Sequence, residues 1–383
     1  MDNLALFALA WVALLAWVYL TLFHWKFWRS DLVLPAVTGA VKKWPSVVAI
    51  IPARNEEEIL GQTLKSVANQ DYPGAFRVIV VNDSSFDNTA RVAKKIKGKA
   101  SVDILDAKPL EAGWAGKLWA MNTGVDWAGK KAKADYIWFT DADICHQPDV
   151  LRGLVEAAVL DNRTMVSQMV KLHCESFWEQ TLVPAFIFFF QLLYPFGAIN
   201  SDKSRRAGAA GGCILIEQAA LRGIGGLGAI KDALIDDCAL AGAVKGAGGR
   251  IWLGFGLKSR SIRAYTFSDF WATVVRTAFT QLHNSWVLLV AAILGLVLIF
   301  LVPLFLFVMG LAGGNPVLSV VGGSGWMASV VLYWPTLRLY RLDAAYGILL
   351  PFVGFLYMLM TLHSALRHLG GTGGRWKERS YDF

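Results

Sequence analysis

The amino-acid sequence predicts an α/β domain with a parallel sheet, joined to several transmembrane helices. Only 17% of the 383 residues are charged, whereas about 25% is usual for a soluble domain. Long apolar segments occupy both ends of the chain, and between them β-rich runs alternate with helical patterns. That alternation is typical of a parallel sheet whose strands are joined by right-handed helical crossovers.

The first apolar segment is Leu4–Phe23, which is about long enough to cross ~30 Å of hydrocarbon. Asp2 precedes it, and Lys26 and Arg29 follow it. A cleaved signal peptide would carry its positive charge before the apolar core. We therefore expect residues 1–25 to form an uncleaved transmembrane anchor, with an external N-terminus and the following chain in the cytosol.

Three further apolar segments lie within residues 286–368, and a basic tail, 369–383, follows them. They are Trp286–Gly310, Val317–Trp334 and Tyr346–Leu366. The last of the three has basic residues on both sides and is interrupted by Pro351. This pattern favours a segment that re-enters the membrane or lies kinked at its surface, although simple alternation of spans would make it cross.

A fifth apolar segment, Phe177–Phe196, lies inside the more polar part of the chain. Glu179, Gln180 and Pro184 interrupt it, which is unfavourable for a span and favourable for a helix in the membrane surface. We expect residues 177–197 to be such an interfacial segment within the α/β domain. A buried core helix is the alternative.

The α/β domain is expected over residues 46–285. Its predicted strands are 46–51, 77–81, 101–105 and 135–140, and its predicted helices are 56–70, 87–96, 116–127 and 148–160. Polar clusters directly follow three of these strands: Pro52-Ala-Arg-Asn-Glu56, Asn82-Asp83 and Asp141-Ala-Asp143. Ligands of open α/β sheets bind outside the carboxyl ends of the strands, so the clusters predict a binding site. The sequence has neither a glycine-rich dinucleotide fingerprint after the first strand nor a P-loop.

Asp141-Ala-Asp143 predicts a site for a hard divalent cation. Mg²⁺ and Mn²⁺ prefer carboxylate oxygens and can keep coordination positions open for phosphate. We expect Asp143 and Asp141 to bind the metal, which would stabilise a departing nucleoside diphosphate. Two aspartates at this spacing also occur in solvated loops, and their position at the end of a strand favours the functional interpretation.

Other residues of the polar clusters are expected to bind the nucleotide. Asp83 can accept a hydrogen bond from a base edge, with a turn or N-cap aspartate as the alternative. Asn55 and Glu56, which follow Pro52, can hold the ribose or start a helix. Lys117 opens a predicted helix and can reach a pyrophosphate at its N-terminus, with an ordinary surface lysine as the alternative.

Two adjacent acids, Asp236 and Asp237, stand in an otherwise apolar run. Like-charge proximity and desolvation raise carboxyl pKa values, and a base must take the proton of an acceptor hydroxyl. Asp237 is the predicted base and Asp236 orients the acceptor or its neighbour, with two helix-start carboxylates as the alternative. Gly211 and Gly212 permit close approach of the backbone to a ligand, or form a packing turn.

The net charge is +8, from 37 basic and 29 acidic residues. Together with the apolar segments, this charge suits anionic lipids and a phosphate-rich substrate better than a nucleic acid, so we expect no nucleic-acid partner. The four cysteines lack metal-ligand spacing and are interpreted as free thiols.

These motifs as a set resemble the inverting family 2 glycosyltransferases of the GT-A fold, over about residues 46–286. The chain is still more similar to the bacterial hopene-associated glycosyltransferases, which are linked to hopanoid lipid biosynthesis. This second resemblance rests on four stretches: Leu172–Trp178, Tyr194–Phe196, Arg276–Gln281 and Arg375–Tyr381.

The resemblance implies a Rossmann-like, nucleotide-sugar-binding domain and an enzyme of the bacterial inner membrane. Asp83 would contact the base, Asp143 the metal with Asp141 beside it, and Asp237 would be the general base. Related members carry a Q-x-x-R-W element near the membrane, and this sequence lacks that element. Arg276 would then lie over the diphosphate in its place. The implied substrates are a nucleotide-sugar donor and a membrane lipid acceptor, with Mg²⁺ or Mn²⁺ as the cofactor.

Three other functions stay open on the sequence alone. The acceptor could be a polyprenyl phosphate rather than a neutral lipid. A membrane nucleotidyltransferase would release pyrophosphate instead of a nucleoside diphosphate. A non-catalytic membrane scaffold that has kept the fold would tolerate neutralisation of the acids.

Overall fold

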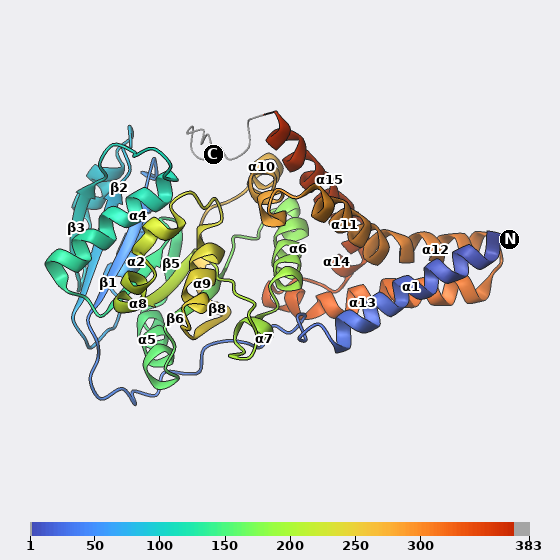
Figure 1. Ribbon diagram of the computed structural model, residues 1–383, viewed down its shortest axis with the longest axis horizontal. Coiled ribbons are helices and arrows are strands. Elements are labelled where there is room, and N and C mark those ends of the chain that lie inside the picture. Colours follow the sequence, from blue (N-terminus) through green and yellow to red (C-terminus); the bar gives the residue numbers. More distant parts are fainter. Residues whose placement is uncertain (1, 371–383) are drawn as a thin grey trace. The chain divides into compact units, whose positions relative to one another are not determined.

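The structure is a computed structural model that describes residues 2–370, and the chain forms two compact units (Figure 1). The sheet unit contains residues 31–173 and 198–264. The helical unit contains, of the described residues, 2–30, 174–197 and 265–370. The expected domain boundaries differ from this division, because residues 174–197 and 265–285 belong to the helical unit. Positions 371–383 of the expected basic tail lie outside the described residues.

One eight-stranded sheet, in the order β3-β2-β1-β4-β7-β6-β8-β5, forms the centre of the sheet unit. The four predicted strands pair in parallel: β1 (Val47–Ala53), β2 (Phe76–Asn82), β3 (Ser101–Asp106) and β4 (Tyr136–Thr140). Strands β6 and β8 also pair in parallel, but the prediction of a parallel sheet is wrong for β7, which pairs antiparallel with β4 and β6, and for β5, which pairs antiparallel with β8. These strands are β5 (Ile144–His146), β6 (Met165–Lys171), β7 (Cys213–Glu217) and β8 (Ile251–Ser261).

Helices cover the sheet and place their N-termini beside the strand ends. The helices of this unit include α2 (Leu60–Ala68), α3 (Thr89–Lys95), α4 (Gly116–Trp127), α5 (Val150–Leu160), α8 (Gln218–Gly223) and α9 (Asp236–Gly246). Helix α4 has its predicted bounds, whereas α2 begins only at Leu60. Residues 57–59 instead form a turn, in which the N–H groups of Ile59 and Leu60 donate to the carbonyl of Glu56. Asn55, just before this turn, has a left-handed φ of 52°, a conformation that asparagine tolerates.

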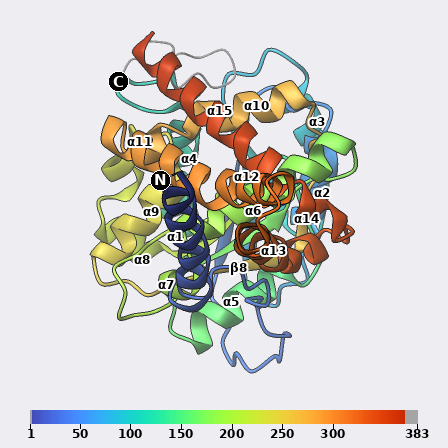
Figure 2. The same ribbon diagram turned by 90° about the vertical axis from the view of Figure 1, so that its right-hand side faces the viewer.

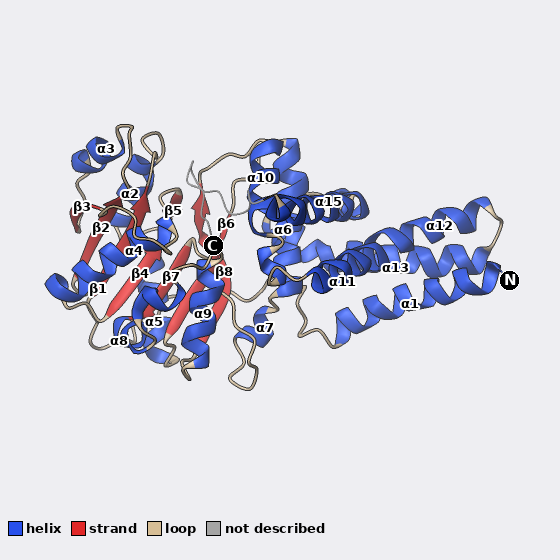
Figure 3. Ribbon diagram, turned by 45° about the horizontal axis from the view of Figure 1, so that its top comes forward, coloured by secondary structure: helices blue, strands red, loops and turns tan. Residues whose placement is uncertain are grey.

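The helical unit contains four helical segments that are long and apolar enough to cross a membrane, by length and composition only. Its helices include α1 (Asp2–Leu22), α6 (Phe177–Leu193), α10 (Phe267–Thr277), α11 (Trp286–Leu296), α12 (Val302–Ala312), α13 (Pro316–Leu339), α14 (Ala345–Ile348) and α15 (Leu350–Leu369). Helices α1, α12 and α13 run side by side (Figures 2 and 3). The apolar segment 346–366 is divided just before Pro351, as expected: α14 ends at Ile348 and α15 begins at Leu350. Pro351 lies in the first turn of α15, where the missing N–H costs nothing.

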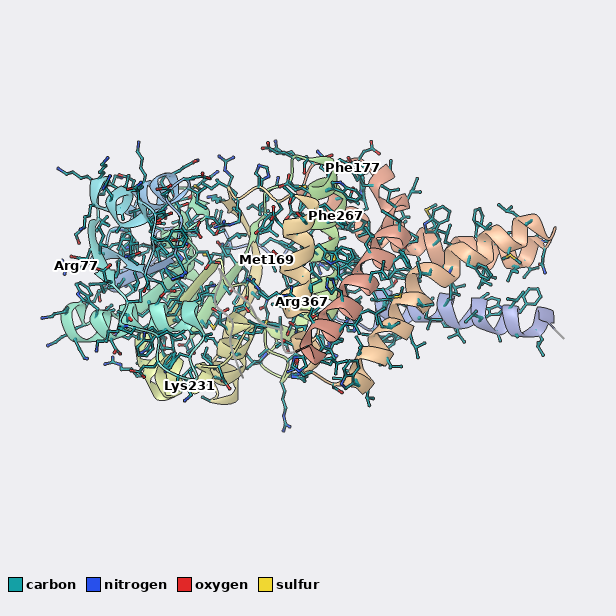
Figure 4. All side chains as sticks on the ribbon, turned by 90° about the horizontal axis from the view of Figure 1, so that it is seen from above. Arg77, Met169, Phe177, Lys231, Phe267 and Arg367 are labelled. Atoms are coloured by element: carbon teal, nitrogen blue, oxygen red, sulfur yellow. The ribbon has the colours of Figure 1, made fainter. Side chains whose placement is uncertain are left out.

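Helix α6 runs across the direction of α1 and α13 (Figures 1 and 3). Most of its side chains are buried within the helical unit, and Gln191 Nε2 donates to the carbonyls of Phe27 and Arg29 at 2.7 and 2.8 Å. Its exposed side chains lie at its two ends, Phe177 and Trp178 in the first turn and Leu193 in the last. The ring of Trp178 contacts those of Phe177 and of Phe267 in α10, which are labelled in Figure 4. Burial thus agrees with the alternative of a packed helix for most of α6, and its location at the membrane surface stays a prediction.

Candidate active site

The loops after β1 and β2 hold each other in place. The backbone N–H of Asn55 donates to Ser85 Oγ at 3.1 Å, and Asn55 Oδ1 accepts from the N–H of Phe86 at 3.1 Å. Arg54 Nη1 donates to the carbonyl of Asp83 at 2.8 Å, and Asp83 is buried. Asn55 therefore uses its side-chain oxygen to fix the loop that carries Asp83, and its predicted contact with a ribose stays untested.

Lys117, in the first turn of α4, joins two other predicted site residues. Its Nζ lies 2.9 Å from Asp141 Oδ1, just after β4, and 3.5 Å from Asp236 Oδ2, in the first turn of α9. Burial alone would lower the pKa of Lys117, but Asp141 and Asp236 outweigh burial and raise it. The alternative of an ordinary surface lysine does not fit a side chain held between two carboxylates.

Asp237 is held by two backbone donors. Its Oδ1 accepts from the N–H of Cys238 and its Oδ2 from the N–H of Gly211, both at 2.7 Å. Burial and then Asp236 raise the pKa of Asp237 to about 6, against the opposing effects of Lys117 and the two N–H groups. A carboxyl group with a pKa near neutrality is suited to general-base catalysis at physiological pH.

The two glycines before β7 have different roles. A Cβ at Gly211 would lie 3.3 Å from Asp237 Oδ2, so the absent side chain lets the backbone approach the carboxylate. A Cβ at Gly212 would lie 3.0 Å from Val170 Cγ2, and the carbonyl of Gly212 accepts from Thr140 Oγ1 at 3.0 Å. Gly212 therefore packs the turn against its neighbours, and its predicted contact with a ligand stays untested.

Asp143 is held from the end of β8, by residues that the sequence analysis missed. Its Oδ2 accepts from Ser261 Oγ at 2.6 Å and lies 3.7 Å from Nε of Arg263. Nη2 of Arg263 in turn lies 2.8 and 2.7 Å from the two carboxylate oxygens of Glu56. Glu56 thus faces an arginine from another strand end. The only sequence signal for this arrangement is the mostly polar stretch, 258–263, that closes a β-rich segment.

A buried histidine supports the turn that carries Asp141 and Asp143. His146 Nε2 lies 2.8 Å from Thr140 Oγ1, and its Nδ1 lies 2.8 Å from Ser259 Oγ. Burial lowers the pKa of His146 to about 3, so the ring is neutral and one nitrogen donates while the other accepts. His146 therefore ties β4 to β8 and fixes both sides of the turn.

Asp141 and Asp143 carry the oxygen donors that a hard divalent cation prefers, and their role as its ligands stays a prediction. Within residues 2–370, no three His, Cys, Asp or Glu side chains are grouped to hold a metal by themselves. Burial is the main cause that raises the pKa of Asp141, Asp143 adds to it and Lys117 opposes it, so Lys117 supplies part of the positive charge that these carboxylates favour. Mg²⁺ and Mn²⁺ commonly use one or two carboxylates and complete their shell with phosphate and water.

The two remaining predicted site residues lie on other elements. Pro52 lies in β1, paired in register with Val81 of β2. Arg276 lies in the last turn of α10, in the helical unit, and its role over a diphosphate stays a prediction.

Comparisons with known proteins agree with this architecture. Residues 48–225 match the family model described as Glycosyl transferase family 2. A probable glycosyltransferase, YdaM of Bacillus subtilis, is 33% identical over 139 residues, which are 36% of this chain and 32% of that protein. The 4,4'-diaponeurosporenoate glycosyltransferase of Staphylococcus aureus is 42% identical over 99 residues, or 26% of this chain and 24% of the relative. The chain thus aligns with only a quarter to a third of the length of these curated relatives.

A solved structure shares the fold over nearly the whole chain. The mannosyltransferase of Pyrobaculum calidifontis, solved with GDP-Man and Mn²⁺, has a TM-score of 0.56 at 18% identity, and the match covers 98% of both chains. The fold is therefore a GT-A-type, Rossmann-like α/β domain accompanied by long apolar helices, and residues 48–225 are similar to glycosyltransferase family 2 domains.

Proposed function

We propose that the protein is an inverting glycosyltransferase that moves a sugar from a nucleotide-diphospho-sugar to a membrane lipid. The observation that carries this proposal is Asp237, a carboxylate with a pKa of about 6 in the first turn of α9. It stands beside Asp236, which Lys117 connects to the strand-end Asp141. The proposed base and the lysine proposed to bind phosphate are thus linked through Asp236, which supports the proposal.

The donor would bind along the carboxyl ends of β1, β2 and β4. Asp83 would accept from the nucleobase, and Lys117 would meet the diphosphate at the N-terminus of α4, where the helix dipole favours negative charge. Asp141 and Asp143 would hold Mg²⁺ or Mn²⁺, which when bound neutralises charge on the departing diphosphate. Arg276 would add a further positive charge over that group.

Asp237 would take the proton of the acceptor hydroxyl. The acceptor oxygen then forms a bond to the anomeric carbon while the bond from that carbon to the diphosphate oxygen breaks. Attack on the face opposite the leaving group inverts the configuration. The products are a glycosylated acceptor, a nucleoside diphosphate and protonated Asp237, which returns its proton to water.

A membrane lipid is the acceptor that best fits the chain. Four apolar segments are long enough to span a bilayer, and one relative is named for its action on 4,4'-diaponeurosporenoate. The resemblance to the hopene-associated group favours a hopanoid, the inner membrane of a bacterium and a cytosolic sheet unit. The second candidate acceptor is a polyprenyl phosphate, which would lose acceptor activity when its phosphate is removed.

The test is transfer of label from a panel of UDP-, GDP- and dTDP-sugars, with Mn²⁺ or Mg²⁺, into a lipid extract that contains hopanoids. Membranes with the wild-type protein would be compared with membranes that carry Asp237→Asn. Label in the lipid phase only with the wild type supports the proposal, and mass analysis of the product identifies the acceptor. Folded protein that binds none of the nucleotides would contradict it.

A further inference from the structure

Each carboxylate of the Asp141-Ala-Asp143 turn faces its own cation within the sheet unit. Asp141 Oδ1 lies 2.9 Å from Nζ of Lys117, and Asp143 Oδ2 lies 3.7 Å from Nε of Arg263. The two cations come from different elements, the start of α4 and the end of β8. Positive charge therefore stands beside both proposed metal ligands.

Arg263 is held more firmly by Glu56 than by Asp143. Nη2 of Arg263 lies 2.8 and 2.7 Å from the Glu56 oxygens, and the Glu56 side chain is only 7% exposed. The 3.7 Å between Arg263 and Asp143 is too long for a hydrogen bond. Asp143 instead receives a hydrogen bond from Ser261 at 2.6 Å. Glu56 is thus the anchor of the guanidinium, and Asp143 is a weaker contact that can be exchanged.

A metal at Asp143 would stand within a few ångströms of this guanidinium. Two cations at that distance repel each other, so metal binding alone is opposed as long as Arg263 faces Asp143. A nucleoside diphosphate changes this balance because its oxygens accept bidentate hydrogen bonds from a guanidinium. The side chain of Arg263 is 35% exposed and can turn its outer N–H groups to such a ligand while Glu56 keeps its inner position.

We propose that Arg263 is a diphosphate-binding residue that stays beside Asp143 until donor and metal arrive together. Exchange of Asp143 for the diphosphate couples the two ligands, so each raises the affinity of the protein for the other by the same factor. This inference rests on the proposed function only in taking the ligand to be a nucleoside diphosphate.

The test measures Mn²⁺ binding by electron paramagnetic resonance, with and without UDP or GDP, on purified full-length protein and without acceptor. In the wild type, the nucleotide should tighten Mn²⁺ binding by about tenfold or more. In Arg263→Gln, Mn²⁺ should bind more tightly than in the wild type when nucleotide is absent, and the coupling should fall below about threefold. Arg263→Lys keeps the charge without the bidentate geometry and should be intermediate.

Two further variants keep this test decisive. Arg263→Gln leaves the buried Glu56 carboxylate without this partner, so the double variant Glu56→Gln/Arg263→Gln provides the same measurement if the single variant does not fold. Arg152→Gln removes a guanidinium that pairs with Asp71 at 3.0 Å on the surface, and it should retain the full coupling.

The outcomes separate this inference from the proposed function. Unchanged coupling in both Arg263 variants, in a protein that transfers sugar, overturns the role of Arg263 alone. Coupling that depends on Arg263, in a protein that transfers no sugar to any lipid, supports the inference and contradicts the proposed transfer.

Discussion

Lowering the pH from 7 to 5 should reduce kcat/KM for sugar transfer about tenfold if Asp237 is the base. With a pKa of about 6, roughly nine-tenths of the carboxyl groups are ionised at pH 7 and roughly one-tenth at pH 5. An ordinary aspartate, with a pKa of about 3.9, is more than nine-tenths ionised at both values. The size of the decrease therefore distinguishes the environment of Asp237 from that of a solvated carboxylate.

The causes of the shift predict how two variants change this profile. Burial raises the pKa of Asp237 most and Asp236 raises it next. Asp236→Asn removes a like charge, so the ascending limb of the pH profile, in which kcat/KM rises as Asp237 ionises, should move to lower pH. Asp237→Asn removes the titrating group itself. It should spare donor binding, abolish the limb and reduce turnover by ~100-fold or more.

The assay is the initial rate of label transfer into lipid at limiting donor, because kcat/KM reports ionisation of the free enzyme. The Mn²⁺ concentration is raised at each pH until the rate no longer changes. A decrease in rate at low pH is then not caused by weaker metal binding. Tryptophan fluorescence checks that the protein stays folded at pH 5. A kcat/KM that is equal at pH 7 and pH 5 in folded protein would refute the assignment of Asp237.

Asp143→Ala should abolish metal-dependent donor binding, and undiminished nucleotide affinity in Mn²⁺ would contradict the metal assignment. The pKa of His146 is lowered to about 3 from an unfolded value near 6.5, so its contribution to stability is complete above pH 6.5 and is lost as the pH falls. In His146→Gln, the free energy of unfolding, measured by thermal unfolding at several pH values, should lose the contribution of His146, which changes by up to about 1.4 kcal/mol per pH unit. A pH dependence of stability equal to that of the wild type would contradict this role of His146. Gly124→Ala places a Cβ 2.6 Å from Ile50 Cγ2 and should destabilise the sheet unit by about 1–3 kcal/mol. Gly223→Ala, whose Cβ meets nothing within 4 Å, should leave the melting temperature nearly unchanged and is the matched control.

The parallel half of the sheet could be predicted because its signals are local. Strands β1, β2 and β4 consist mostly of apolar residues and are followed by polar ones, β3 mixes polar and apolar residues, and helical patterns separate the four. The other four strands were missed because β5 has only three residues and β7 pairs with strands on either side through long connections. Neighbours that are distant in sequence leave no periodic pattern in the chain.

The candidate site likewise contains residues that local patterns predict and residues that only long-range pairing brings together. Lys117, Asp141 and Asp236 stand at strand ends or helix starts, where local patterns show them. The pairing of Glu56 with Arg263 joins residues 207 positions apart. Glu56 was therefore interpreted as a ribose contact or a helix start, whereas its carboxylate faces an arginine that no motif predicted.

Lys117 and Arg263 occupy different positions in the site, so their substitution should affect different steps. Lys117 contacts both Asp141 and Asp236 and is one of the groups that lower the pKa of Asp237. Arg263 pairs with Glu56 and Asp143 and is not among the causes of that pKa. Lys117→Met should therefore move the ascending limb of kcat/KM to higher pH, whereas Arg263→Gln should weaken donor and metal coupling and leave the limb in place. Equal limbs in the two variants would mean that Lys117 does not connect the diphosphate side of the site to its base.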